Sequence, residues 1–302
     1  SAGEENNHQD LMMAGGAALE GLTNLSALSE NSFFLLALPL RINGTDAGIG
    51  RAVALVGNRT SFSLIDLSPL SNQGTRKITP PFDRLEPVME KSTIMRRLKI
   101  DPFHMDNEFV DIAMYLTFNS HLGTHIETAY YAPLKGGMPS ECLMDVSELP
   151  LEKCMGEAVL LRIPKMPGTL ITAQDLKKVG TNIQRDDIVL IRTDYSDWHY
   201  GRRDFYDRTP GLSQDAADWL VEKKIKLVGI DTASIETQQP SRGSGPSGEC
   251  HHTLYRAGIP IVENLCNLGQ IYQERFFFAG LPPKVKGLEA SPIRAIAIEW
   301  EE

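Results

Sequence analysis

Residues 188 to 230 contain two apolar runs, IVLIR at 188–192 and LVGI at 227–230, with the segment SQDAADWLVEKK at 213–224 between them. Short continuous apolar runs are typical of strands that are buried on both faces. The segment between them carries Asp215 in its first turn and Lys223 and Lys224 in its last turn, an arrangement that favours a helix. A strand, a helix and a second strand in this order predict parallel strands joined by a crossover helix.

The same pattern continues on both sides of this segment. Further short apolar runs bounded by turn residues lie at 64–67, 158–163, 259–262, 276–279 and 295–298. Thr172 and Asp175 have the spacing of a capping box and predict another helix from Leu176 onward. The alternation indicates an α/β protein whose sheet is at least partly parallel. We expect one main domain over residues 62–302, preceded by an N-terminal arm, residues 1–61, with a helix and a loose connection.

The composition excludes several classes of protein. Of the 302 residues, 42% are hydrophobic and 23% are charged, which suits a globular protein with a sizeable core. The net charge of −9 repels phosphate backbones, so nucleic acid is not expected as a partner. The apolar stretch at 33–40 is far shorter than the roughly 20 residues that a bilayer requires, so no membrane span is expected. The four cysteines are too few and too dispersed for a disulfide framework.

Three N-x-[ST] sequons, at Asn24, Asn43 and Asn58, lie in the first sixty residues. The chain begins with Ser1 rather than Met, as a mature secreted protein does after its signal peptide has been removed. A trimmed chain would begin in the same way, and sequons also arise by chance. We therefore expect a secreted or extracellular glycoprotein, with a cytoplasmic location as the alternative.

Four of the seven histidines fall into two groups that each have a carboxylate nearby. In the first group, His121, His125 and Glu127 occupy odd positions, so in an extended chain their side chains face the same way. Gly123, between the two histidines, leaves room for an ion or a substrate. Two imidazoles and a carboxylate are ligands that zinc, manganese and iron accept, with a position left for water. The group therefore predicts a metal site.

The second group combines His251 and His252 with Glu263. The histidines begin a helix-like stretch and the glutamate closes the predicted strand at 259–262, so the chain can fold back and bring the two together. Spacing alone leaves a second interpretation open for both groups, because most histidines are hydrogen-bonded core or surface residues rather than ligands.

A longer pattern includes both groups. The run SHLGTHIETAYY at 120–131 resembles the signature H-x-G-T-H-x-D-x-P-x-H of the cyclase family, metal-dependent hydrolases that include bacterial kynurenine formamidase and isatin hydrolase. Six further segments resemble the motifs of this family in the same order: IDLS at 65–68, DIVLIRT at 187–193, PGLS at 210–213, GIDTAS at 229–234, HHTLYRAGIPIVENLCNL at 251–268 and SPIR at 291–294. The resemblance extends from about residue 62 to residue 299.

The resemblance implies an α/β fold of the swivelling β/β/α type, with a central mixed sheet or barrel flanked by helices. It also implies a divalent metal, zinc or manganese, and the residues that correspond to its ligands are His121, His125, Glu127, His251 and Glu263. The implied activity is hydrolysis of a carbon–nitrogen bond in an amide, formamide or lactam by metal-activated water. The implied partners are a small-molecule substrate and further copies of the chain, in a homodimer or homotetramer.

Two positions depart from the family pattern. Glu127 stands where the family has Asp, and Tyr131 stands where it has the His that acts as general acid or base. A phenol with an ordinary pKa near 10 is a poor base at neutral pH. Tyr131 and His252, together with Tyr130, are therefore the candidates for proton transfer, although the tyrosines could instead line a substrate pocket and His252 could be a plain loop residue.

These departures leave three hypotheses for the function. The first is the hydrolase, the second is a catalytically impaired family member that acts as a binding or structural protein, and the third is a cyclase or lyase that uses the same metal site. Asp231 and Ser234 follow the predicted strand at 227–230. We expect these two residues to bond backbone groups at a turn rather than to act in catalysis.

Overall fold

The structure is a computed structural model, and it describes residues 10–11, 13–28, 32–42, 47–56, 62–66, 94–106, 109–130, 138–202, 204–237 and 248–300. In these residues, the main sheet has nine strands in the order β14-β6-β12-β11-β9-β7-β13-β15-β3. Their bounds are β3 (Phe62–Asp66), β6 (His125–Glu127), β7 (Met155–Arg162), β9 (Ile188–Arg192), β11 (Leu227–Ile230), β12 (Ile261–Glu263), β13 (Arg275–Gly280), β14 (Ala290–Pro292) and β15 (Ala295–Trp300).

The four central strands β7, β9, β11 and β12 run parallel to one another. The strands outside them pair antiparallel, so the sheet is mixed. β9 and β11 are the two apolar runs that predicted the parallel pair, and both have the predicted bounds. The α/β class and the partly parallel sheet are therefore confirmed.

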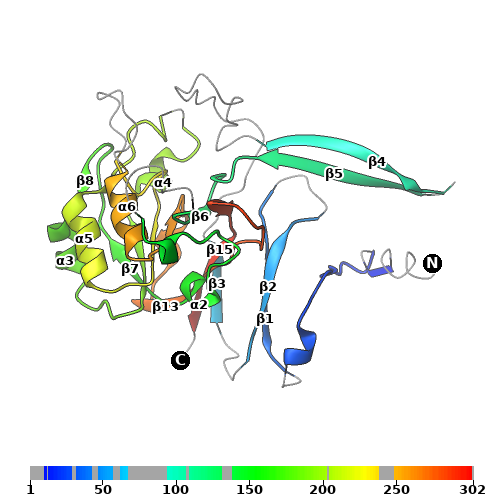
Figure 1. The fold of residues 1–302 in the computed structure, drawn as a ribbon, viewed down its shortest axis with the longest axis horizontal. Coiled ribbons are helices and arrows are strands. Elements are labelled where there is room, and N and C mark those ends of the chain that lie inside the picture. The colour runs from blue at the N-terminus through cyan, green and yellow to red at the C-terminus, as the bar shows by residue number, and fades with distance from the viewer. Residues whose placement is uncertain are drawn as a thin grey trace.

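Crossover helices cover one face of the sheet (Figure 1). They are α3 (Ala173–Val179), α5 (Gln214–Glu222) and α6 (Glu249–Arg256). The predicted capping box is present, because Thr172 Oγ1 accepts from Asp175 N and Asp175 Oδ2 accepts from Thr172 N. The shorter helices are α2 (Leu151–Cys154), α4 (Tyr195–His199), η1 (Leu25–Ala27), η3 (Ser140–Cys142) and η5 (Leu268–Gln270). Among the described residues, no helix has the length and apolarity needed to span a bilayer.

Alternate residues of the central strands divide between two hydrophobic cores. Val189 and Ile191 belong to the core beneath the helices, whereas Ile188 and Leu190 belong to the core on the opposite face. All four side chains are fully buried. This two-sided burial is the physical reason why the run IVLIR is continuously apolar rather than alternating.

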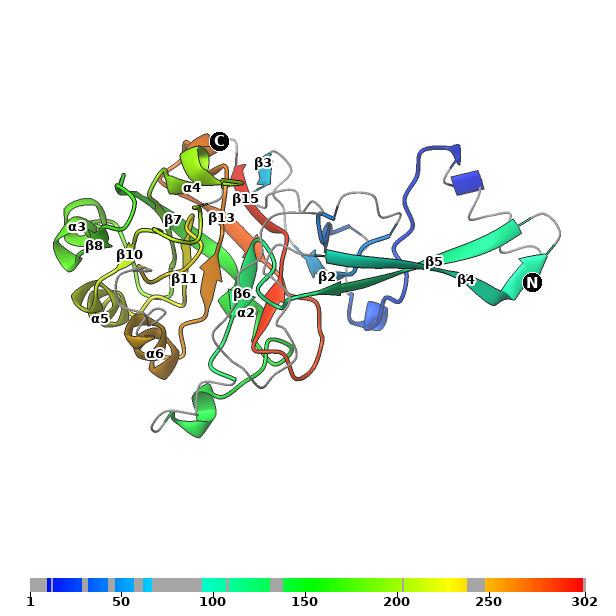
Figure 2. The ribbon, with the colours of Figure 1, turned by 90° about the horizontal axis from the view of Figure 1, so that it is seen from above.

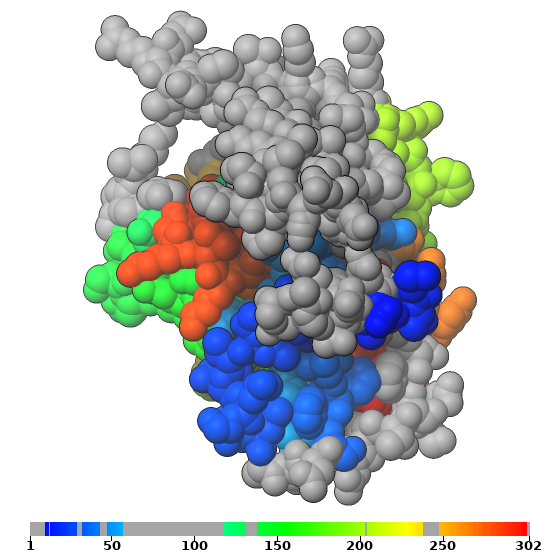
Figure 3. Space-filling model, turned by 90° about the vertical axis from the view of Figure 1, so that its right-hand side faces the viewer, coloured from blue at the N-terminus to red at the C-terminus, as the bar shows by residue number. Residues whose placement is uncertain are grey.

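An N-terminal hairpin closes the second core. β1 (Phe34–Pro39) and β2 (Gly50–Leu55) pair antiparallel, and their buried residues Leu36 and Val53 join the core on the face away from the helices. The loose connection expected over these residues is thus a hairpin, because Phe34, Leu36 and Leu38 of β1 pack inward against this core. Figure 3 shows the N-terminal residues, in blue, on the surface of the molecule next to residues near the C-terminus, in orange and red. The boundary between residues 61 and 62 stays a prediction.

A second, longer hairpin extends away from the main sheet (Figures 1 and 2). It consists of β4 (Ile94–Asp106) and β5 (Phe109–Phe118), which pair antiparallel with each other. The last pair, β8 (Leu170–Ile171) and β10 (Gly211–Leu212), is parallel and lies outside the main sheet. The predicted flexible segment at 238–248 lies outside the described residues except for Gly248.

Arg275 on β13 reaches across β7 to the buried carboxylate of Asp187, which directly precedes β9. Its two terminal nitrogens donate to Oδ2 and Oδ1 of Asp187 at 3.0 and 2.6 Å. We expect Arg275→Ala to lower the free energy of unfolding by about 1–3 kcal/mol in urea denaturation, because the buried carboxylate loses charged donors. The control is Arg185→Ala, whose exposed ion pair with Asp186 at 3.4 Å should contribute less than about 0.5 kcal/mol. Equal losses in the two variants would contradict this prediction.

Asp231 joins the ends of β9 and β11. Its Oδ1 accepts hydrogen bonds from the backbone N–H and the hydroxyl of Thr193, at 2.9 and 2.6 Å. Ser234 Oγ likewise accepts from the backbone N–H of Glu236 at 3.3 Å. These bonds confirm the expectation that Asp231 and Ser234 satisfy backbone groups. The side chain of Asp231 is buried, and burial raises the pKa of Asp231 to about 7.

Stability should therefore depend on the Asp231 carboxyl between about pH 4 and pH 7. Folding favours its protonated form, so this contribution to stability is complete below the unfolded pKa and is lost as the pH rises through the folded pKa. Asp231→Asn keeps an acceptor oxygen and cannot ionise. Between about pH 4 and pH 8 it should gain on the order of a few kcal/mol relative to the wild type. Urea unfolding at both pH values measures this, and a pH-independent difference between the two proteins would rule it out.

Candidate metal centre

His121, His125 and Glu127 come from β6 and the turn that leads into it. β6 pairs antiparallel with β12, which places His125 opposite Glu263. His125 and Glu127 are two residues apart on this strand and share a face. Gly123 has a φ of 58° in the preceding turn, from which Nδ1 of His121 reaches to 3.1 Å from His125 Nε2 and 3.2 Å from Glu127 Oε2. The extended stretch therefore covers only 125–127, and the turn brings His121 to the same place.

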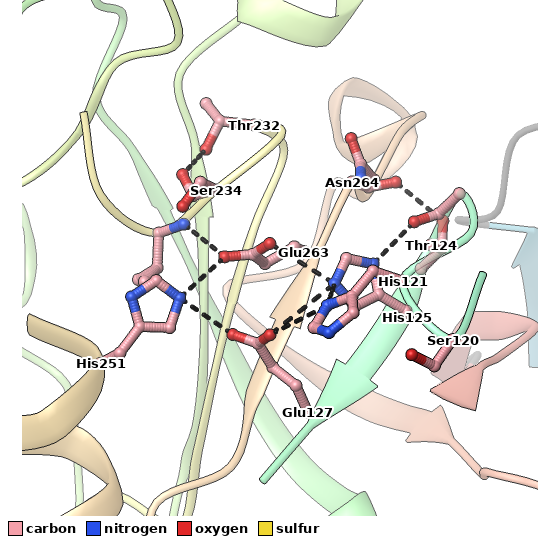
Figure 4. Close-up of polar contacts among 12 residues, drawn as sticks. Ser120, His121, Thr124, His125, Glu127, Thr232, Ser234, His251, Glu263 and Asn264 are labelled. Atoms are coloured by element: carbon pink, nitrogen blue, oxygen red, sulfur yellow. Dashed lines mark hydrogen bonds and ion pairs between the residues drawn. The ribbon is translucent and has the colours of Figure 1, made fainter. Parts of the chain in front are cut away.

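The second predicted group meets the first at Glu127. His251 lies in the first turn of α6 and Glu263 ends β12, so the chain folds back between them as predicted. Nε2 of His251 is 3.0 Å from Glu127 Oε1 and 3.4 Å from Glu263 Oε1, and Glu263 Oε2 is 3.4 Å from His125 Nε2. Figure 4 shows Glu127 between His251 on one side and His121 and His125 on the other. We call these five side chains the His/Glu cluster.

Each histidine of the cluster has its second ring nitrogen near an acceptor outside the cluster. These acceptors are the carbonyl oxygen of Gly123 for His125 Nδ1 at 2.9 Å, Glu289 Oε1 for His121 Nε2 at 3.3 Å and Glu236 Oε1 for His251 Nδ1 at 3.2 Å. An acceptor at the outer nitrogen favours a proton there and leaves the lone pair of the inner nitrogen facing the cluster. The three inner nitrogens are thereby prepared to act as ligands.

Burial and charge couple Glu127 to His251. Burial opposes ionisation of Glu127, but His251 and His121 together hold the pKa of Glu127 well below its ordinary value. Burial also opposes the charged form of His251, and the neighbouring Glu127 carboxylate overcomes it and raises the pKa of His251 well above its ordinary value. Without a metal, the proton on His251 balances the carboxylate. A cation bound by both residues would displace this proton.

The donor set fits a divalent metal such as zinc or manganese. Imidazole nitrogens and carboxylate oxygens are ligands of these ions. Two groups of three residues have ligand atoms within 4.8 Å of one another: His121, His125 and Glu127, and Glu127, His251 and Glu263. Both oxygens of Glu127 face imidazole nitrogens, Oε2 at 3.2 Å from Nδ1 of His121 and Oε1 at 3.0 Å from Nε2 of His251, so a cation that displaces the proton of His251 would find both oxygens turned toward it. Glu127 is the residue that the two groups share.

The described candidates for proton transfer, Tyr130 and His252, are not among the five side chains of this cluster. Tyr131 lies outside the described residues, and Tyr130 is half-buried and lies three residues after the end of β6. His252 follows His251 on α6, where its ring lies 3.8 Å from the place that a Cβ on Gly248 would occupy. Within the described part of the chain, His252 has no contact with the cluster. Its catalytic role stays a prediction.

Tyr255 is a phenol at the cluster that the sequence analysis missed. It lies one helical turn after His251 on α6, with the two rings 5.9 Å apart. Burial and the nearby Glu127 carboxylate raise the pKa of Tyr255 well above its ordinary value. Tyr255 therefore remains a protonated donor. The i, i+4 spacing from His251 on a predicted helix was the available signal.

Glu236 and Glu289 were also missed. Burial opposes the ionisation of Glu289, but hydrogen bonds from His121 and Ser120 lower its pKa to about 2. The hydroxyl of Ser120 donates to Glu289 Oε1 at 2.7 Å. The sequence offers only a weak signal for these glutamates, namely their proximity to the family-like segments GIDTAS and SPIR.

Comparisons with known proteins point to one family. The family model described as "Putative cyclase" matches residues 65–237, more than half of the chain. Kynurenine formamidase of Bacillus thuringiensis (strain Al Hakam) is 26% identical over 181 residues, which are 60% of this chain and 77% of that protein. An uncharacterized protein of Methanocaldococcus jannaschii is 29% identical over 188 residues, which are 62% of this chain and 83% of that protein.

A solved structure gives the same result for the fold. An isatin hydrolase bound to the product analogue thioisatinate superposes with a TM-score of 0.65 at 21% identity, and the match covers 80% of this chain and 94% of that chain. The likeness confirms the fold implied by the sequence motifs, a mixed sheet flanked by helices. Since the family model covers most of the central sheet and the first of the two histidine groups, the chain belongs to the cyclase family.

Proposed function

We propose that this chain is a metal-dependent hydrolase that cleaves a carbon–nitrogen bond in an amide, formamide or lactam. The observation that carries the proposal is the convergence of three imidazoles and two buried carboxylates from β6, α6 and β12. Similarity to kynurenine formamidase and to an isatin hydrolase supports this class of reaction. Zinc or manganese held by these residues would supply a Lewis acid that lowers the pKa of water and polarises a carbonyl group.

The exposure of the cluster indicates the side from which substrate enters. The side chains of His121 and His251 are 23% and 17% exposed, whereas those of His125, Glu127 and Glu263 are almost fully buried. A small-molecule substrate would therefore approach past the two exposed imidazoles. The buried residues on the other side exclude water and hold the carboxylates in place.

The replacement of the family's Asp by Glu127 does not remove the carboxylate from the cluster. Both of its oxygens lie within 3.2 Å of an imidazole nitrogen, one at His121 and one at His251. This geometry supports a retained metal site. The observation that favours the alternative, a catalytically impaired binding protein, is Tyr131 in place of the family's His. A cyclase or lyase reaction at the same site is the third candidate.

Protein purified without chelator should contain about one or two equivalents of zinc or manganese by elemental mass spectrometry. It should release formate from N-formyl arylamines or open a small lactam. His125→Ala removes a buried ligand and should lose the metal and at least about 100-fold in kcat/KM. His252→Ala is the matched control for metal content, because its ring lies outside the cluster.

The outcomes separate the hypotheses. A wild-type protein that takes up neither metal contradicts the proposal. A protein that holds metal but hydrolyses no amide, even after Tyr131→His restores the family residue, favours the impaired family member. Turnover without hydrolysis product favours the cyclase or lyase.

We further propose that the chain forms a homodimer or homotetramer and is an extracellular glycoprotein. A two-stranded ribbon is marginal in water by itself, and among the described residues β4 and β5 pair only with each other. A second copy of the chain would give this ribbon a surface to pack on. The three sequons support the location; Asn24 is exposed, whereas Asn43 and Asn58 lie outside the described residues.

One experiment tests both statements. Protein secreted from eukaryotic cells should have the mass of two or four chains by light scattering, and an N-glycosidase should lower this mass. Asn24→Gln should remove one glycan, since this exposed sequon is accessible. The mass of a single chain would overturn the assembly, and an unchanged mass after the glycosidase would overturn the glycosylated form.

A further inference from the structure

Glu236 is a buried carboxylate that lies outside the His/Glu cluster and contacts it through His251. It is 4% exposed and follows β11, where it forms an isolated bridge with Leu212. Its Oε2 accepts from the backbone N–H of Gly248, and its Oε1 accepts from the backbone N–H of His251, both at 2.9 Å. The same Oε1 lies 3.2 Å from the ring nitrogen Nδ1 of His251.

The start of α6 explains the two backbone contacts. The residue before the helix is Gly248, which has a φ of 74°. As a glycine it has no side chain that could cap the helix. The first backbone N–H groups of a helix have no acceptor within the helix. Glu236 supplies these acceptors from another segment, and its negative charge suits the positive end of the helix dipole. The first turn of α6, and His251 with it, is therefore held at a defined place relative to β11.

The third contact acts on the ring itself. Nδ1 of His251 is buried, and it makes no hydrogen bond to any residue that the structure describes. Glu236 Oε1 lies 3.2 Å away, so it is the acceptor that a proton on Nδ1 would meet after a small rotation of the ring. With the proton on that side, the lone pair of Nε2 faces Glu127 Oε1 at 3.0 Å and Glu263 Oε1 at 3.4 Å.

We propose that Glu236 is the positioning residue of His251 and holds its ring so that Nε2 faces the space in which the ligand atoms converge. The inference rests on the proposed function, because that space is the proposed metal site. Glu236 touches neither the metal nor the substrate and acts only through His251. Its role at the start of α6 and its role at the ring can be separated, because the first needs only the backbone of residue 251 and the second needs its side chain.

A double-mutant cycle makes this separation. Glu236→Ala and Glu236→Gln are each prepared in the wild-type chain and in His251→Ala, and the dissociation constants of Zn²⁺ and Mn²⁺ are measured by chelator competition. In the wild-type background we expect about 10–100-fold weaker binding for Glu236→Ala, with a smaller loss for Glu236→Gln, which keeps one acceptor oxygen. In the His251→Ala background we expect a change of less than about twofold. Equal losses in both backgrounds, or no loss in the wild type, would overturn the inference.

Two controls report on the structural role. The stability of the metal-free proteins in urea should fall in both backgrounds, because the backbone N–H groups of Gly248 and residue 251 are present in each. Glu289→Gln is the matched carboxylate variant, since Glu289 faces His121 instead. It should weaken metal binding by the same factor whether or not His251 is present. If Glu289→Gln loses its effect in His251→Ala, the cycle does not isolate His251 and the inference is refuted.

If the wild type binds neither metal, the proposed function is refuted but the inference about Glu236 is not. A spectroscopic measurement on metal-free protein tests that inference separately. In metal-free protein labelled with ¹⁵N-histidine, the His251 signals are identified by their absence from His251→Ala. We expect a slowly exchanging proton on Nδ1 of His251 in the wild type and its loss in Glu236→Ala. The same protected proton in both proteins would show that Glu236 does not hold the ring.

Discussion

A carboxylate buried among imidazoles is stable only where its oxygens face positive or proton-donating partners. Glu127 meets this condition with Oε2 at 3.2 Å from His121 and Oε1 at 3.0 Å from His251. The turn before β6 and the first turn of α6 must therefore stay at fixed positions relative to each other. A proton on His251 or a bound cation can satisfy the same carboxylate, which ties metal binding to proton release.

The sheet provides the rigid support that this constraint requires. Four parallel strands are buried on both faces, and β6 lies between β12 and β14 beside them. Glu263 ends β12 and pairs with His125 on the neighbouring strand, so the backbones of both residues are fixed by the sheet. Thr124 Oγ1 also donates to the carbonyl oxygen of Asn264 at 2.7 Å and joins the turn to the strand end (Figure 4). Functional side chains on such elements are held more precisely than side chains on free loops.

The departures from the family motif have different structural consequences. Glu127 has a longer side chain than the family's Asp, yet its carboxylate lies inside the cluster and serves both groups of ligands. The change at Tyr131 concerns proton transfer rather than the ligands. Tyr255 adds a phenol beside Glu127, whose carboxylate raises the pKa of Tyr255 and keeps it protonated. The chain thus keeps three imidazoles and two carboxylates together, while the groups around them differ from the family pattern.

Local patterns in the sequence determined β9, α5, β11 and the first histidine group. The spacing of apolar residues, the charges at helix ends and the alternation of side chains along a strand each depend on a few neighbouring residues. The motif order also predicted that His251 and Glu263 belong with that group. Only the tertiary structure placed Glu236 behind His251 and showed that β1 and β2 form a hairpin that closes a core. A single glutamate in a sequence looks like any surface residue, and its partner lies in a distant segment. Such contacts depend on how whole elements pack, which no local pattern records.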